Sequence, residues 1–111
     1  MKKWLIGLFF FILLYTRLVG INWGLPYSLH PDELKMAYAT LDISLQKLYS
    51  SYFWAYGAFH INLTHAILSL FHITLDLPHV VIGLRLISIV FSILTAIFGI
   101  KIIHTGLSQE R

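Results

Sequence analysis

Two long apolar stretches, separated by a more polar and aromatic region, form the main pattern along the chain. The first stretch follows Lys2 and Lys3 and continues to Ile21, with Arg17 close to its end. No small-residue cleavage motif follows it, so we expect a retained anchor and not a signal peptide. The pattern predicts a transmembrane helix over 4–21, whose length of roughly 18 residues is near the minimum for a span.

The second apolar stretch lies toward the C-terminus and has clearer limits. Asp76 and Pro78 supply an N-terminal helix signal, and no charged residue interrupts the sequence from Leu86 to Ile100. We expect a second transmembrane helix over 80–104.

The region 22–79 has the pattern of a loop with helices on the membrane surface. Glycine and proline residues interrupt its first part. From Asp32 to Tyr52, apolar residues then recur at spacings of three and four, which predicts an amphipathic helix. Its expected apolar face comprises Leu34, Tyr38, Leu41, Leu45, Leu48 and Tyr52.

A further helix is predicted over about 58–75, and its placement decides the topology. It is long enough to span but carries three histidines and an asparagine, which are costly in hydrocarbon. If it crossed the bilayer, the last helix would run outward and leave Lys101 and Arg111 outside, against the positive-inside rule. We therefore expect it to lie along the interface or to re-enter, with both chain ends in the cytoplasm.

These elements predict an all-α membrane protein in which two transmembrane helices flank extracytoplasmic, juxtamembrane amphipathic helices. The composition agrees, because 58% of the residues are hydrophobic and the mean hydropathy is +0.76. The net charge of +3 comes from isolated residues and no basic stretch is interleaved with aromatics, so nothing favours a nucleic-acid partner. The lack of cysteine excludes disulfides and thiolate metal sites.

The segment His30-Pro31-Asp32-Glu33 is the main candidate for chemistry. Asp32 and Glu33 are the only adjacent carboxylates of the chain, and they closely follow the first predicted span. In a structural interpretation, Asp32 caps the following helix and Glu33 is a solvated first-turn residue. In a catalytic interpretation, the pair acts in acid–base chemistry at the membrane surface.

Four segments together resemble the beginning of the integral-membrane glycosyltransferases of the GT-C superfamily. The first two are Arg17-Leu18-Val19-Gly20-Ile21-Asn22-Trp23-Gly24-Leu25-Pro26 and His30-Pro31-Asp32-Glu33. The later two are Phe53-Trp54-Ala55-Tyr56-Gly57-Ala58-Phe59 and Arg85-Leu86-Ile87-Ser88. Their order and spacing are similar to those of the group related to protein O-mannosyltransferases and aminoarabinose transferases.

The resemblance implies transfer of a sugar from a polyprenyl-phosphate or diphosphate carrier to an acceptor on the outer side of the cytoplasmic membrane. Carried over to this sequence, the general base falls on Asp32, with Glu33 as its neighbour. Like-charge repulsion and partial burial would make such a carboxylate more basic, as deprotonation of a sugar hydroxyl requires. His30 could orient the pair, or it could be a loop histidine in water.

Two arginines are candidates for binding the donor phosphate. Arg17 and Arg85 are both predicted near the outer interface, where charge-assisted hydrogen bonds to a lipid-linked phosphate would form. For each arginine the alternative is a snorkelling side chain or a partner for Asp32, Glu33 or Asp76.

Tyr56 is a candidate for a wall that faces the sugar or the lipid, although aromatic belts at membrane interfaces are the more common arrangement. No metal site is predicted, because the histidine spacings lack the i, i+4 pair of a helical site. A divalent cation would belong to the metal-dependent members of the family.

Members of the family run to several hundred residues, whereas this chain ends after the second predicted span. We therefore expect residues 1–111 to be an N-terminal fragment that is inactive alone. Its expected partners are the bilayer, a polyprenyl-phosphate sugar donor and the missing C-terminal part as a separate chain. The alternative is a small, non-catalytic membrane protein that scaffolds or regulates a partner complex through the helix from Asp32 to Tyr52.

Overall fold

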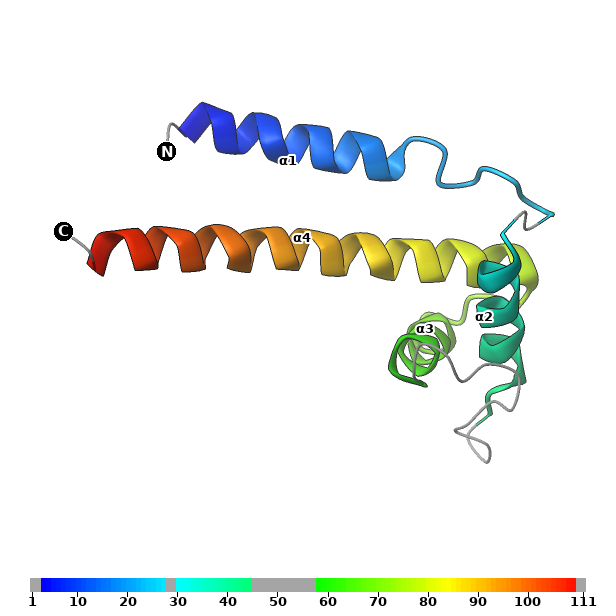
Figure 1. The fold of residues 1–111 in the computed structure, drawn as a ribbon. Coiled ribbons are helices and arrows are strands. Elements are labelled where there is room, and N and C mark those ends of the chain that lie inside the picture. Colours follow the sequence, from blue (N-terminus) through cyan, green and yellow to red (C-terminus); the bar gives the residue numbers. More distant parts are fainter. Residues whose placement is uncertain (1–2, 28–29, 45–57, 110–111) are drawn as a thin grey trace. The chain divides into compact units, whose positions relative to one another are not determined.

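The computed structural model describes residues 3–27, 30–44 and 58–109 (Figure 1). This part of the chain is built from α-helices and contains no β-strand, which confirms the predicted all-α class. The helices are α1 (Lys3–Leu18), α2 (Pro31–Asp42), α3 (Ala58–Leu70) and α4 (Leu77–Gln109). The chain divides into two compact units, one of Met1–Gly20 with Ser88–Arg111 and one of Ile21–Ile87, so α4 contributes to both.

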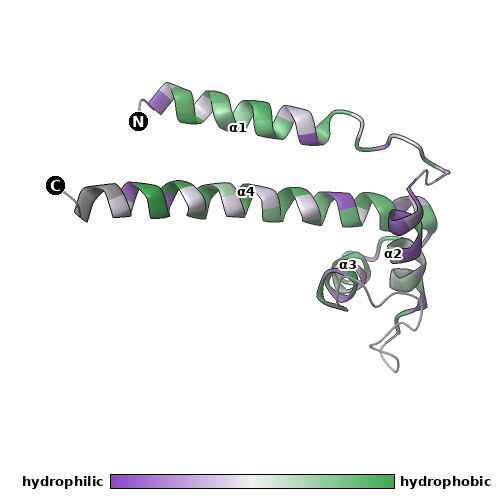
Figure 2. Ribbon diagram, in the orientation of Figure 1, coloured by the Kyte–Doolittle hydropathy of each residue, from purple (hydrophilic) through white to green (hydrophobic). Residues whose placement is uncertain are grey.

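Helix α4 is long and apolar enough to cross a membrane by length and composition. Its segment Leu77–Gly106 has 30 residues, which corresponds to about 45 Å at a rise of 1.5 Å per residue. Hydrophobic residues predominate along it (Figure 2). The segment contains the span predicted over 80–104 and exceeds the roughly 30 Å of a hydrocarbon core, so part of α4 must project beyond it.

The predicted span over 4–21 is not found in that form. Helix α1 ends at Leu18, and Gly20 has a φ of 75°, which a residue with a side chain rarely adopts. Its 16 residues correspond to about 24 Å, less than a typical hydrocarbon core. Within the described residues α4 alone meets the length and composition of a span, so the structure shows one transmembrane candidate where the sequence predicted two.

The predicted amphipathic helix from Asp32 to Tyr52 is also shorter than expected. Helix α2 ends at Asp42, because Ile43 has an extended conformation with a ψ of 139°; the part of the prediction beyond residue 44 falls outside the described residues. The expected apolar face is wrong at Tyr38, whose side chain is 51% exposed. The buried residues of α2 are the small ones, Ala37, Ala39 and Thr40.

Helix α3 has 13 residues, about 20 Å, and is too short to span as a straight helix. The prediction over 58–75 overestimated its length, because the chain reverses at its end. The backbone N–H of Ile73 donates to the carbonyl of Leu68 at 2.9 Å and that of His72 to Ser69 at 3.1 Å. These bonds form a Schellman motif, in which His72 takes the left-handed position with a φ of 53°.

Replacing His72 by glycine is expected to stabilise this end of α3. A non-glycine residue in the left-handed region carries a steric penalty of about 1 kcal/mol, so His72→Gly should raise the free energy of unfolding of α3 by a similar amount. Amide hydrogen exchange of α3 provides the measurement. His72→Ala, which retains the Cβ, should give no such gain, and equal effects of the two substitutions would contradict the explanation.

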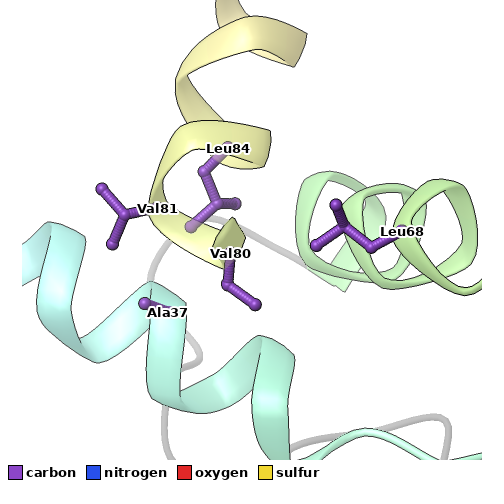
Figure 3. Packing of buried hydrophobic residues seen from close by; sticks show 5 residues of the cluster. All are labelled: Ala37, Leu68, Val80, Val81 and Leu84. Atoms are coloured by element: carbon purple, nitrogen blue, oxygen red, sulfur yellow. The ribbon is translucent and has the colours of Figure 1, made fainter. Parts of the chain in front are cut away.

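Helices α2, α3 and the first turns of α4 share a small apolar core. Figure 3 shows Ala37 from α2 and Leu68 from α3 around three residues of α4. The three are Val80, Val81 and Leu84, which are at most 4% exposed. A second cluster joins α2 to α3 through Ala39, Ile43 and Ile61. Small residues on α2 permit this close approach of helices.

Gly83 is expected to be essential for the contact between α4 and α3. A Cβ at this position would lie 3.1 Å from Thr64 Cγ2 and 3.4 Å from Leu68 Cδ1, and Thr64 is fully buried. Overpacking should make Gly83→Val destabilise the contact by about 2 kcal/mol, although valine has the higher helix propensity. Hydrogen exchange of α3 measures the effect. Gly99→Val is the control, since nothing lies within 4 Å of a Cβ there; equal losses would contradict the argument.

Asp76 caps the start of α4 and makes this helix end sensitive to acid. Its Oδ1 accepts hydrogen bonds from the backbone N–H of His79 at 3.0 Å and from the ring of His79 at 2.6 Å. These bonds, the backbone one foremost, lower the pKa of Asp76 below its ordinary value of 3.8.

Because this pKa is lower in the folded than in the unfolded state, the cap contributes fully above about pH 4 and is lost as the pH falls through the folded value. We expect the His79 amide to lose exchange protection over this acid range. Asparagine caps helices as well as aspartate does, so in Asp76→Asn the protection of the His79 amide should be independent of pH. If the variant lost protection in acid as the native chain does, the assignment would be refuted.

Candidate functional site

The ion pair between Arg85 of α4 and Glu33 of α2 is the centre of the candidate site. Arg85 Nε donates to Glu33 Oε1 at 2.6 Å, and Arg85 Nη2 donates to Glu33 Oε2 at 2.7 Å. Both side chains are about one-fifth exposed. Two parallel hydrogen bonds between a guanidinium and a carboxylate fix orientation as well as distance. The pair therefore locks the first turn of α2 against α4.

The same guanidinium also binds the loop that precedes α2. Arg85 Nη1 donates to the carbonyl oxygens of Ile21 and of Trp23, the latter at 3.0 Å. The loop turns at this point: Leu25 N–H donates to the Asn22 carbonyl at 3.2 Å, and Gly24 has a φ of 82° that permits the turn. Four of the five N–H donors of Arg85 are thus used within the protein.

Asp32 differs from its neighbour in having no hydrogen-bond or ionic partner within the part of the chain that the structure describes. It lies in the first turn of α2, directly after Pro31 at the start of the helix. Proline is favoured there, and an acidic side chain interacts favourably with the helix dipole. The side chain of Asp32 is partly exposed, so its carboxylate can reach a bound molecule.

The two carboxylates therefore have different environments. The sequence predicted a pair of mutually repelling charges, but the guanidinium of Arg85 compensates the charge of Glu33. For Arg85 the sequence left open phosphate binding, snorkelling or pairing with a carboxylate. The structure agrees with pairing, because Arg85 binds Glu33. With one N–H donor left, Arg85 has little capacity to bind a phosphate directly.

The other predicted site residues are not all brought to this place. His30 occupies the N-cap position of α2 but makes no capping hydrogen bond with its side chain. Arg17 is exposed near the end of α1 and forms no ion pair with a described residue. It belongs to the other unit of the chain. Tyr56 lies outside the described residues.

Two histidines take structural positions that the sequence did not indicate. His65 Nδ1 lies 3.1 Å from the carbonyl of Thr40, near the end of α2, and His60 Nε2 lies 3.2 Å from the carbonyl of Leu84. Imidazole N–H groups at these positions satisfy carbonyl groups of the neighbouring helices. Within the described ranges, no three His, Asp or Glu side chains gather as a metal site would require.

The arrangement can thus present one carboxylate, Asp32, on a helix start that is held rigidly by its neighbour Glu33. Comparison with protein-family models, curated proteins and solved structures finds no match to this chain.

Proposed function

We propose that the chain is the first-loop module of a membrane glycosyltransferase, in which Asp32 is the general base that receives a proton from the acceptor hydroxyl. The donor is a sugar on a polyprenyl-phosphate carrier, and the acceptor lies on the outer side of the cytoplasmic membrane. A positioned carboxylate of this kind accelerates proton transfer by about 100- to 10,000-fold. The remainder of the site would come from a further polypeptide segment.

One observation carries the proposal. Three of the segments that resemble the GT-C superfamily meet at the side chain of Arg85, which lies at least 52 positions after the other two. They are the loop at Ile21 and Trp23, the helix start at Glu33 and the segment that begins with Arg85 itself. Their meeting at one side chain supports the proposal that the three segments form one site.

The ion pair supports a division of labour between the two carboxylates. Glu33 is engaged by two short hydrogen bonds, so it positions the first turn of α2 and does not need to react. Asp32 is adjacent in sequence and has no such partner among the described residues. Rigid support beside a free catalytic group is the usual arrangement of an active site.

The topology belongs to the same proposal. We place both chain ends in the cytoplasm, α1 and α4 in the membrane, and the loop with Asp32 outside. The short apolar length of α1 is accommodated by local thinning of the bilayer and by snorkelling of Lys3 and Arg17 at its ends.

Single-cysteine labelling tests this topology without background, because the chain contains no cysteine. Tyr27→Cys, at a position that is 78% exposed, should react with an impermeant maleimide in intact cells. Gly106→Cys should react only after lysis. Labelling of Gly106→Cys in intact cells would refute the topology.

Photo-cross-linking tests the donor class directly. The chain in phospholipid nanodiscs is irradiated with a polyprenyl phosphate that carries a benzophenone group. We expect cross-linking that an excess of polyprenyl phosphate suppresses and that polyprenyl alcohol of the same length does not. Equal competition by the alcohol would show that the phosphate is not recognised, and would favour the alternative of a non-catalytic membrane scaffold.

A further inference from the structure

The uncharged apolar stretch of α4 begins directly after Arg85. Before this residue, the apolar side chains Val80, Val81 and Leu84 are buried against α2 and α3. After it, no charged residue occurs until Lys101; Leu86 and Val90 are 44% and 54% exposed, whereas Ile87 and Ile89 are each 8% exposed. Apolar side chains that the protein itself does not cover are suited to hydrocarbon. Arg85 is therefore the last charged residue before an uncharged stretch of α4 that has an exposed apolar face.

The loop before α2 is tied to Arg85. Side chains of a helix slant toward its N-terminus, so the guanidinium of Arg85 is expected toward the N-terminal end of α4. It donates to the carbonyls of Ile21 and Trp23. The backbone of the loop therefore lies within one side chain of the last charged residue before the uncharged stretch of α4.

The large side chains of this loop differ in exposure. Leu25 packs against the core cluster, whereas Trp23 is 68% exposed and Tyr27 is 78% exposed. Tryptophan and tyrosine are enriched where a membrane meets water, because each combines an apolar ring with a polar group. Two such rings on a loop that is anchored at the edge of a membrane helix fit the headgroup layer.

We propose that the loop of residues 21–27 docks onto the headgroup layer of the bilayer through Trp23 and Tyr27, at a depth set by Arg85. Because Arg85 also holds Glu33, the adjacent Asp32 lies at the same level as the lipid phosphates. The site then takes a substrate whose phosphate is already in the membrane surface, and not one from solution. This inference rests on the proposed membrane placement of α4.

Depth-dependent fluorescence quenching tests the proposal. Trp4→Phe and Trp54→Phe leave Trp23 as the only tryptophan, and the protein is reconstituted in phosphatidylcholine vesicles with bromines either near the headgroup or near the acyl-chain ends. We expect the emission of Trp23 to shift to the blue on reconstitution. Shallow bromines should quench it more strongly than deep ones.

A depth reference separates this proposal from the placement of α4. In a protein with all three tryptophans replaced by phenylalanine, Ile93→Trp puts an indole eight positions beyond Arg85, about 12 Å along the helix. Since half of a hydrocarbon core is about 15 Å, deep bromines should quench this reference more strongly than shallow ones.

The quenching of Trp23 and of the reference tryptophan can give three contrary results. If the reference is quenched by deep bromines but Trp23 keeps the emission of a hydrated indole, the loop does not dock and α4 still crosses the membrane. If Trp23 is also quenched mainly by deep bromines, the loop is immersed and the proposed depth is wrong. If neither bromolipid quenches the reference, α4 does not cross, and both the membrane placement and this inference fail.

Discussion

Replacing Asp32 by asparagine is expected to lower sugar transfer at least about 100-fold, the smallest usual contribution of a general base. Asparagine has nearly the shape of aspartate and remains a favourable residue at a helix start, but its amide cannot accept a proton at neutral pH. Transfer from a radiolabelled polyprenyl-phosphate sugar is measured in membranes in which the variant replaces the native chain.

Asp76→Asn is the matched control. It also removes one carboxylate at a helix start, but Asp76 caps α4 and takes no part in the ion pair between Arg85 and Glu33. We expect its transfer rate to equal that of the native chain. If Asp32→Asn keeps the native rate as well, Asp32 is not the base and the catalytic proposal falls.

Replacing Arg85 by methionine should have the largest effect on stability. Methionine retains much of the apolar length of the side chain but leaves Glu33 and the carbonyls of Ile21 and Trp23 without the guanidinium. Removing one partner of a fully buried ion pair costs about 3–5 kcal/mol. Because both side chains are about one-fifth exposed, we expect a loss near the lower limit, about 3 kcal/mol.

Hydrogen exchange of the α2 amides measures this loss as a decrease in the free energy of local opening. The segment of α4 beyond Ser88 lies in the other unit and should keep its protection, which provides an internal control. Arg17→Met is the matched variant, since Arg17 has no described ion-pair partner. Equal loss of α2 protection in the two variants would contradict the role of Arg85.

A double-mutant cycle separates the ion pair from the carbonyl contacts. Glu33→Gln should destabilise α2 less than Arg85→Met, because Arg85 can still donate to Ile21 and Trp23. The double variant should lose less than the sum of the two single losses, since the interaction between Glu33 and Arg85 is counted in both. Strict additivity would show that the pair contributes nothing to stability.

Transfer activity connects these two predictions. If Glu33 only positions the turn that carries Asp32, Glu33→Gln should reduce transfer far less than Asp32→Asn. The remaining transfer rate should be proportional to the fraction of molecules in which α2 is folded and packed against α4. An effect of Glu33→Gln as large as that of Asp32→Asn, with α2 still protected, would show that Glu33 takes part in the chemistry.

The helical class, the long apolar helix α4 and the acidic start of α2 could all be predicted from the sequence. These features depend on the order of residues along a short stretch: the uncharged run from Leu86 to Ile100, and Pro31 followed by Asp32 and Glu33. The sequence also narrowed the possible roles of Arg85, one of which was a partner for Glu33.

Helix limits and the buried face were decided by the tertiary structure. Apolar periodicity continues past Asp42 and Leu70, but the chain leaves the helical conformation after both residues. Similarly, Tyr38 of the face predicted for α2 is exposed and the small residues Ala37 and Thr40 are fully buried, because small side chains allow close packing of helices. Leu41 of that face packs against the core.

The difference between the two adjacent carboxylates was decided by tertiary structure alone. Nothing in the local sequence states whether Asp32 or Glu33 meets a cation, because the cation is 52 positions away from Glu33. An ion pair of this kind forms only after α2 has packed against α4, through contacts whose geometry no short sequence window contains. The chemistry of the site thus depends on packing, whereas the presence of the two carboxylates depends on the sequence.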